Sequence, residues 1–489
     1  MSREKLRKFI LKFKHTVMIM ADVVVVNPAT EEVIATIPPA SRDDVREAVD
    51  NAESAFYEWS GLPLRERIRL IYRAAEFLES SEEELLTTLI AESGKPIRDA
   101  RAELRRAIEL FRVSAEEARH ILEGRVPRVD GYDYPPMNEQ RLVIEVREPI
   151  GVVAGALSYN NPASTFAHKV APQIIAGNTV IAKPSTHTPL TALLMRDILY
   201  KAGIPKGVVQ VVVGSGEEVF NEFLENPKVV GISFTGSTAV GLQVAAKAAS
   251  KGKKFMIAPS GSDPAIVFAD ADLEMAAATV VRARFENAGQ NCNATKRVFV
   301  EESVFDKFME LLIERARSIK VGDPMDESTD MGPLISEKMV KSMESFVSDA
   351  VQKGGELMHG GRRISRRGYF FEPTVIRFRE FVSAKVLQEE VFGPVLPVVP
   401  FREEEEAVKL ANSTQYGLQA AVFTADYKRA FRVARRLRAG SVMINDSTRV
   451  RFDALPYGGV KMSGFGAREG VRSTILHFTE PKYYVLKVD

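Results

Sequence analysis

Four short apolar runs alternate with helical segments after residue 150, and they restrict the fold more than any other feature of this 489-residue chain. The runs are GVVAGAL, NTVIAKP, VVQVVVG and VVGISFTG, separated by helix-like segments such as 188–202. Strands that are apolar on both faces are typical of parallel sheets covered by helices on both sides. The pattern therefore predicts an α/β fold with a doubly wound sheet, an architecture that binds nucleotides.

A second α/β set follows between residues 265 and 445, and it includes VFVEESVF, TVIRF and AAVFTAD. A chain of this length is too long for one hydrophobic core, so we expect at least two domains. Two further strands are predicted at 141–147 and 482–487. The first follows a segment rich in Gly, Pro and Tyr, and we expect it to form a ribbon between subunits or domains.

Charge and hydropathy restrict the partners of the chain. Its 66 basic and 65 acidic residues nearly cancel, so no global field indicates a nucleic acid partner. No apolar run approaches the roughly 20 residues of a membrane-spanning helix, so we expect no membrane partner. Residues 1–20 carry an excess of basic residues. They are predicted to be a disordered extension, with an amphipathic surface helix as the alternative.

The low cysteine content indicates a compartment and, more weakly, an adaptation. One cysteine in a charge-rich chain fits a reducing cytoplasm, and we expect a cytoplasmic protein. The same composition fits a heat-adapted (thermophilic) protein rich in surface ion pairs.

Cys292, the only cysteine, lies in the stretch FENAGQNCNATKR. A lone thiol cannot form an intramolecular disulfide, so it is either an inert buried residue or a nucleophile. Its neighbours are amides, which is not typical of a packing cysteine, and Gly289 permits a sharp turn. Backbone N–H groups in such a turn stabilise a thiolate and a developing oxyanion. The stretch is therefore interpreted as a nucleophile loop.

Several small or polar residues follow the predicted strands, where open α/β sheets bind their ligands. The phrase SFTGST ends a strand at 233–238 and opens a helix, so its backbone N–H groups can meet a pyrophosphate. Neither this phrase nor Gly214-Ser215-Gly216 is a complete dinucleotide fingerprint. Lys183 leaves the end of another buried strand, and Asn160 ends the first one. Asn160 is a candidate donor to an oxyanion.

Taken in order, these pieces resemble the NAD(P)-dependent aldehyde dehydrogenase superfamily over nearly the whole chain after about residue 22. The matching motifs are GVVAGALSYNNP, IAKPSTHTP, SFTGSTAVG, FENAGQNCNATKR, GDPMDESTDMGPLI, FEPTV, EEVFGP and LPYGGVKMSGFGAREG. The resemblance implies a cofactor-binding domain, a catalytic domain and a ribbon that builds dimers or tetramers. The expected boundaries are 21–126 with 148–258 for the cofactor-binding domain, 259–465 for the catalytic domain, and 127–147 with 466–489 for the oligomerisation element.

The resemblance also implies residue roles. Cys292 would be the nucleophile, and Asn160 with the Cys292 backbone N–H would form the oxyanion hole. NADP, or alternatively NAD, would be the cofactor, and a small aldehyde the substrate. The residues expected at the cofactor site are Ser158, Tyr159, Lys183, Ser185, Thr186, Gly214, Gly236, Ser237, Glu390 and Phe392.

One segment departs from the family pattern. The usual Glu-Leu-Gly-Gly reads Ala258-Pro259-Ser260-Gly261 here, so the customary general base is an alanine. Three interpretations are open. The base has moved, with Glu286 or Glu469 as candidates; or coenzyme A replaces water as the acyl acceptor; or the chain is a non-catalytic cofactor-binding scaffold.

Two further features concern specificity. Many NAD-preferring relatives carry a glutamate at the position of Thr186, which repels a 2′-phosphate. Thr186 removes that repulsion, so NADP should be accepted. Arg449 and Arg451 are candidates for binding an anionic or hydroxylated aldehyde, with ion pairs to Asp446 or Asp453 as the alternative. The six histidines show no ligand spacing, so no metal site is predicted.

Overall fold

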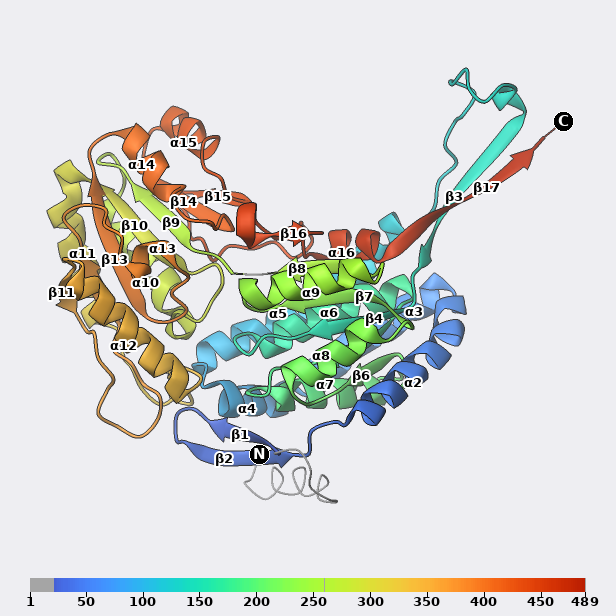
Figure 1. Ribbon diagram of the computed structural model, residues 1–489, viewed down its shortest axis with the longest axis horizontal. Coiled ribbons are helices and arrows are strands. Elements are labelled where there is room, and N and C mark those ends of the chain that lie inside the picture. The colour runs from blue at the N-terminus through green and yellow to red at the C-terminus, as the bar shows by residue number, and fades with distance from the viewer. Residues whose placement is uncertain (1–21, 259, 489) are drawn as a thin grey trace.

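Figure 1 shows a computed structural model in which two α/β bodies lie side by side and a two-stranded ribbon projects away from them. The structure describes residues 22–258 and 260–488, so the predicted extension at 1–20 lies outside the described residues. Within these ranges, no helix is long and apolar enough to cross a membrane.

The first body is built on a six-stranded sheet with the order β16-β8-β7-β4-β5-β6. Its strands are β4 (Val152–Ala156), β5 (Thr179–Lys183), β6 (Val209–Val211), β7 (Val229–Thr235), β8 (Lys254–Ala258) and β16 (Phe465–Gly466). All pair in parallel except β16, which is antiparallel to β8. Every residue of β4 and β5 is buried, as expected for strands covered on both faces.

Helices cover both faces of this sheet, which confirms the predicted doubly wound fold. In β5, Ile181 packs with the helices of one face, whereas its neighbours Val180 and Ala182 pack with those of the other. The first face carries α2 (Arg42–Gly61), α8 (Gly216–Glu225) and α9 (Thr238–Ser250). The second carries α3 (Leu64–Ser80), α4 (Glu82–Ser93), α5 (Ile97–Ile121), α6 (Pro162–Ala176), α7 (Pro189–Lys201) and α16 (Val471–His477).

The second body contains a seven-stranded sheet with the order β11-β12-β13-β10-β9-β14-β15, and only β11 is antiparallel. The strands are β9 (Asp263–Val267), β10 (Thr295–Glu301), β11 (Glu356–His359), β12 (Thr374–Arg377), β13 (Val395–Phe401), β14 (Gln419–Phe423) and β15 (Ser441–Ile444). Its helices are α10 (Leu273–Phe285), α11 (Phe305–Arg317), α12 (Glu337–Gln352), α13 (Lys385–Gln388), α14 (Glu404–Ala411) and α15 (Tyr427–Ala434). One continuous apolar cluster joins this sheet to its helices.

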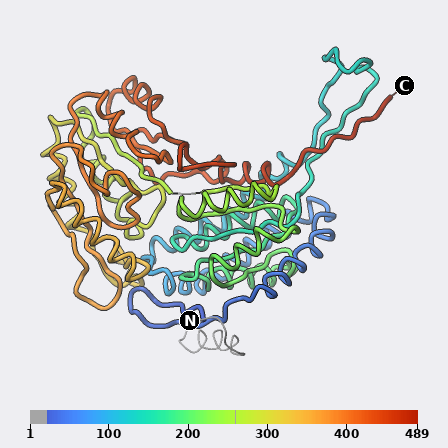
Figure 2. Tube along the Cα trace, viewed as in Figure 1, coloured from blue at the N-terminus to red at the C-terminus, as the bar shows by residue number. Residues whose placement is uncertain are grey.

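Two antiparallel pairs complete the fold. The hairpin of β1 (Val23–Asn27) and β2 (Glu32–Ile37) packs against the first body. The projecting ribbon is formed by β3 (Arg141–Pro149) and β17 (Thr479–Lys487), which include both predicted ribbon strands. Figure 2 shows that the end of β17 extends far from either body.

The arrangement of the two sheets determines where a site can form. The chain leaves the first sheet at Ala258, the last residue of β8, and enters the second at Asp263, the first residue of β9. The carboxyl ends of β4, β5, β7 and β8 and the residues just before β10 border the same cavity. Carboxyl ends of parallel strands are the usual ligand-binding edge of such a sheet.

Candidate functional site

A cavity of about 590 Å³ lies between the two sheets and brings most of the predicted residues together. Its lining includes both residues of the predicted reaction centre, Cys292 and Asn160. The other predicted residues in the lining are Ser158, Tyr159, Lys183, Ser185, Thr186, Gly236, Ser237, Glu390, Phe392, Arg449, Arg451 and Glu469. Gly214 and Glu286 are not in the lining, and Gly216 borders the cavity where Gly214 was expected.

The chain bends sharply just before the thiol. Asn287, Ala288 and Gly289 all have positive φ angles, of 54°, 53° and 72°. A Cβ atom on Gly289 would lie 2.4 Å from the carbonyl oxygen of Gly393, so this position admits only glycine. The predicted turn at Gly289 is thus present, and it extends over two preceding residues that rarely adopt this conformation.

Asn160 lies against this turn. Its side-chain amide donates to the carbonyl oxygen of Gln290 (2.8 Å), and its own carbonyl oxygen accepts from the amide of Asn287 (3.1 Å). The first bond orients the side-chain amide of Asn160 and the second holds its backbone against the thiol loop, and the residue is 8% exposed. The two predicted partners of an oxyanion are therefore held on facing elements.

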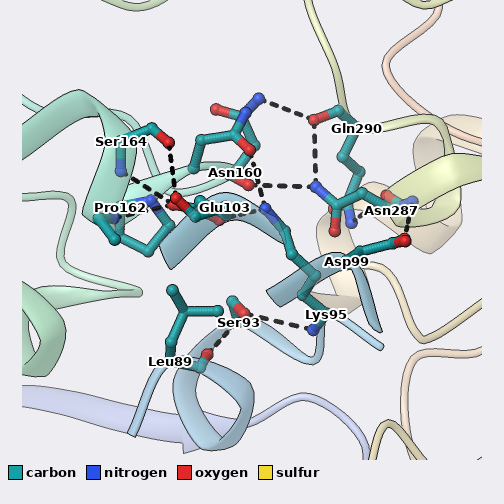
Figure 3. A network of polar contacts seen from close by, with 12 residues as sticks. Leu89, Ser93, Lys95, Asp99, Glu103, Asn160, Pro162, Ser164, Asn287 and Gln290 are labelled. Atoms are coloured by element: carbon teal, nitrogen blue, oxygen red, sulfur yellow. Dashed lines mark hydrogen bonds and ion pairs between the residues drawn. The ribbon is translucent and has the colours of Figure 1, made fainter. Parts of the chain in front are cut away.

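A buried ion pair lies beside the loop that carries Asn160 (Figure 3). The Lys95 ammonium contacts the Glu103 carboxylate and donates to Asn161 Oδ1 (2.8 Å). Glu103 also accepts from the backbone N–H groups of Ala163 (2.9 Å) and Ser164 (3.1 Å) in the first turn of α6. Both members of the pair are 3% exposed, so each depends on the other for compensation of its charge.

A second buried cation links the thiol loop to the cofactor side. The Lys296 ammonium donates to the carbonyl oxygens of Asn291 (3.0 Å) and Cys292 (2.5 Å) and to Glu390 Oε1 (3.2 Å). The same Glu390 oxygen accepts from the N–H of Gly261 (3.1 Å). The predicted cofactor carboxylate is thus tied directly to the backbone of the thiol residue.

Tyr457 contacts the thiol itself. Its hydroxyl oxygen lies 3.2 Å from Cys292 Sγ, within hydrogen-bonding distance for sulfur. Its ring lies under the guanidinium group of Arg451, 3.9 Å from the ring centroid. The sequence analysis did not identify Tyr457, because 165 residues separate it from Cys292 along the chain.

The two candidate arginines are both ion-paired. Arg449 donates to Glu286 Oε1 (2.6 Å) and contacts Asn293 Oδ1. Arg451 pairs with Glu469 (3.0 Å) and with Asp453 (3.1 Å), so the expected alternative partner Asp453 is present. The guanidinium groups border the cavity, whereas Glu286 and Asp453 lie behind them.

These ion pairs alter the two candidate bases. Burial opposes ionisation of Glu286, but the charge and hydrogen bond of Arg449, together with the charges of Lys95 and Arg282, outweigh it and lower the pKa of this carboxyl. Burial likewise opposes ionisation of Glu469, yet Lys169 (2.7 Å) and Arg451 hold its pKa well below the usual range. A carboxylate with a lowered pKa is a weak base.

Two more residues on this side of the cavity, next to Arg451, were not predicted from the sequence. Arg106 pairs with Asp453 (2.5 Å), and His168 Nε2 lies 3.2 Å from the same carboxylate. Burial, with a smaller effect from Arg451, lowers the pKa of His168 to about 4, so this imidazole is neutral near pH 7. Neither residue belongs to a recognisable motif, and only the fold brings them together.

The cofactor half of the cavity fits a phosphate-bearing nucleotide. The Lys183 ammonium is 7% exposed and donates to the carbonyl oxygen of Pro184 (3.1 Å), and burial lowers its pKa to about 8. The buried hydroxyl of Thr235 has no partner within the described residues. Ser237 precedes the first turn of α9, whose N–H groups favour an anion. These donors suit the phosphates and ribose of NADP or NAD.

Known proteins resemble the chain over most of its length. The model of the family described as "Aldehyde dehydrogenase family" matches residues 19–484. A mitochondrial succinate-semialdehyde dehydrogenase of Oryza sativa is 39% identical over 94% of this chain and 85% of its own, and a lactaldehyde dehydrogenase of Methanocaldococcus jannaschii is 37% identical over 95% and 97%. A crystal structure of a glyceraldehyde-3-phosphate dehydrogenase from Methanocaldococcus jannaschii, complexed with NADP, matches with a TM-score of 0.89 and 36% identity over 96% of this chain and 100% of that one.

The buried pair beside the Asn160 loop leads to a stability prediction. Lys95→Met should lower the free energy of unfolding by about 3 kcal/mol, because it leaves the Glu103 carboxylate buried without its cation. Denaturant unfolding followed by circular dichroism measures this loss. Lys228→Met is the matched control, since Lys228 forms exposed ion pairs with Asp50 and Glu53 and its loss should change the free energy of unfolding far less. Equal losses in the two variants would contradict the assigned role of Lys95.

Proposed function

Because the chain belongs to the aldehyde dehydrogenase family, we propose that it oxidises a small aldehyde to a carboxylic acid with NADP or NAD, through a thiohemiacetal and a thioester on Cys292. The observation that carries this proposal is the position of the only cysteine. Cys292 borders the same cavity as the Asn160 amide on one side and the nucleotide-compatible donors on the other.

The first step follows from the geometry around the thiol. The Cys292 sulfur attacks the aldehyde carbon, a C–S bond forms, and the carbonyl electron pair moves to oxygen. One N–H of the Asn160 amide is used by Gln290, and its second N–H is directed to the oxyanion together with the Cys292 backbone N–H. Preorganised donors of this kind are usually the largest single contribution to catalysis of acyl transfer.

The cofactor roles rest on the donors described above. Lys183, Ser237 and Thr186 would hold the adenosine ribose and phosphates, and Glu390 would hold the ribose next to the reaction centre. A bound nicotinamide supplies the hydride acceptor. A 2′-phosphate meets the Lys183 cation and no carboxylate at residue 186, which supports NADP as the preferred cofactor.

Release of the acyl group is the unusual step of this chain. Ala258 borders the cavity but offers no base, and the ion-paired Glu286 and Glu469 are weak bases. We therefore propose that hydrolysis of the thioester limits turnover. Transfer to coenzyme A is the second candidate, favoured by the same alanine, because a thiol acceptor does not require a base at position 258.

Arg106, Arg449 and Arg451 line one side of the cavity, which we call the substrate wall. This wall is suited to an aldehyde with an anionic or hydroxylated distal group. The guanidinium groups of Arg106, Arg449 and Arg451 border the cavity, whereas two of their carboxylate partners do not. A carboxylate or hydroxyl on the substrate can therefore meet cations whose charge is only partly compensated. Two of the relatives are named for succinate semialdehyde and lactaldehyde, which carry a carboxylate and a hydroxyl group, respectively.

The ribbon of β3 and β17 is proposed to build a homodimer or homotetramer. Along β17, Tyr483, Tyr484, Val485 and Leu486 are between 44% and 60% exposed, so apolar side chains on both faces lack cover within the described chain. An isolated two-stranded ribbon is marginally stable in water, and contiguous exposed apolar surface of this kind marks an interface.

The first prediction from this proposal concerns single turnovers. NADPH formation with succinate semialdehyde, lactaldehyde and butyraldehyde should show a burst of about one equivalent per Cys292, followed by slower turnover. The burst should be faster with NADP than with NAD and faster with the two polar aldehydes. Cys292→Ala should abolish it while NADP binding persists. Activity in that variant would refute the nucleophile assignment, and acceleration by coenzyme A with an acyl-CoA product would favour the second candidate.

Restoring a base at the end of β8 should change only the slow step. In Ala258→Glu, the steady-state rate should rise by at least about tenfold, because a general base typically contributes 10²- to 10⁴-fold. The burst should change little. Ala258→Gln, which has the same size without a base, is the matched control. If both variants turn over at the wild-type rate, the rate of hydrolysis is not limited by the absence of a base at this position.

The ribbon gives a prediction about assembly. Val485→Lys with Leu486→Lys should shift the mass measured by light scattering toward the monomer, because desolvation of two added charges opposes burial of the strand. Lys428→Ala, on the exposed side of α15 away from the ribbon, is the control. An unchanged mass in the double variant would place the interface elsewhere.

A further inference from the structure

The hydroxyl of Tyr457 is the polar group that directly contacts the sulfur of Cys292. The Oη–Sγ distance is 3.2 Å, and both atoms border the same cavity. Geometry alone allows either atom to be the donor. The surroundings of the two groups decide the direction.

The tyrosine ring is held in place on two sides. The backbone N–H of Tyr457 donates to the carbonyl oxygen of Glu469 (2.5 Å). The Arg451 guanidinium covers the ring at 3.9 Å and is itself fixed by ion pairs to Glu469 and Asp453. The hydroxyl is therefore already oriented toward the sulfur, as is required of a preorganised hydrogen-bonding group.

The order of ionisation identifies the donor. A thiol ordinarily ionises near pH 8.5 and a phenol near pH 10. Burial raises the pKa of Tyr457 well above its usual range, which keeps the phenolic proton in place. When the thiolate forms, the proton between the two atoms is therefore on oxygen, and the cation over the ring favours the O–H group as a donor.

The alanine at position 258 makes this donor necessary. Ala258 offers the sulfur neither a base nor a hydrogen-bond donor. The thiolate must therefore be favoured by groups that stabilise negative charge. Besides Tyr457, Arg449 exerts an electrostatic effect at this position, since Cys292 is one of the groups that raise its pKa.

We propose that the Tyr457 hydroxyl donates a hydrogen bond to the Cys292 thiolate, increases the fraction of reactive anion near neutral pH and orients the sulfur toward the Asn160 amide. This inference rests on the proposed role of Cys292 as nucleophile. It assigns to the reaction a tyrosine from the segment that closes the substrate half of the cavity.

The direct test is the reactivity of the thiol in Tyr457→Phe. This variant keeps the ring and its contact with Arg451 and removes only the hydroxyl. Because Cys292 is the only cysteine, the rate of alkylation by iodoacetamide reports on this sulfur alone. At pH 7 we expect alkylation to slow by about tenfold, as for loss of a hydrogen bond to a charged group, and the pH profile to move to higher pH. An unchanged profile, or faster alkylation, would overturn the proposal.

Tyr200→Phe is the matched control for loss of a phenolic hydrogen bond. The Tyr200 hydroxyl donates to the carbonyl oxygen of Val209 (2.6 Å) in the first body, and this residue does not border the cavity. Its alkylation profile should match that of the wild type even if its melting temperature falls. A shift equal to that of Tyr457→Phe would mean that the fold, and not the contact with sulfur, controls the thiol.

A second measurement avoids any loss of side-chain volume. The 12 tyrosines can be replaced biosynthetically by fluorotyrosine, whose more acidic hydroxyl is a stronger donor. Alkylation of Cys292 at pH 7 should then be about twofold faster, because a charge-assisted hydrogen bond strengthens with the donor. An unchanged or slower rate would contradict the proposal.

Alkylation and turnover separate this inference from the proposed function. If Cys292→Ala retains dehydrogenase activity, the nucleophile assignment fails whatever the alkylation shows. If Cys292 is required and Tyr457→Phe alkylates as the wild type does, only the role of Tyr457 fails. In the expected case, Tyr457→Phe also slows the burst by a similar factor at pH 7, and raising the pH restores most of it.

Discussion

The left-handed turn at residues 287–289 is the constraint on which the rest of the site depends. It directs the Gln290 carbonyl toward the Asn160 amide and the Asn287 amide toward the Asn160 carbonyl, so two loops from different sheets lock together. Non-glycine residues in this conformation cost free energy, and the surrounding hydrogen bonds offset that cost. The buried ammonium of Lys296 donates to the carbonyl oxygens of Asn291 and Cys292 and to Glu390, and thereby links the turn to Glu390.

Paired charges form the substrate wall, which explains how a cavity with several ionised groups remains stable. Each guanidinium group has a carboxylate partner, and a buried ion loses less hydration free energy when its partner lies at hydrogen-bonding distance. The same pairing weakens every carboxylate of the wall as a base. The ionised groups of this wall are therefore weak bases, and the alanine at the end of β8 supplies no base either.

The sequence predicted the parts of this architecture that depend on local pattern. Apolar runs that are buried on both faces, such as β5, predicted the doubly wound sheet, and Gly289 among amides predicted the sharp turn before Cys292. The contacts of Tyr457 with Cys292 and of His168 with Asp453 could not be predicted, because each joins segments more than 150 residues apart and no local spacing encodes it. Gly216 borders the cavity in place of Gly214 because the strand before them, β6, ends at Val211, earlier than the apolar run suggested. The ion-paired state of Glu286 depends likewise on a distant arginine.

The C-terminal segment of the chain contributes to the first sheet, to the helices that cover it, to the ribbon and to the cavity wall. Strand β16 closes the edge of the first sheet, α16 packs behind it, and β17 supplies half of the ribbon. Arg451 and Tyr457 precede them in the cavity wall. During synthesis on the ribosome, the emerging first body therefore lacks an edge strand, and the thiol lacks its neighbour, until residues 457–466 have emerged. Domains usually fold as they emerge, from the N-terminal side. Here the surroundings of Cys292 are complete only after Tyr457 has emerged, so a product truncated before this residue would carry the thiol without its hydrogen-bonding neighbour.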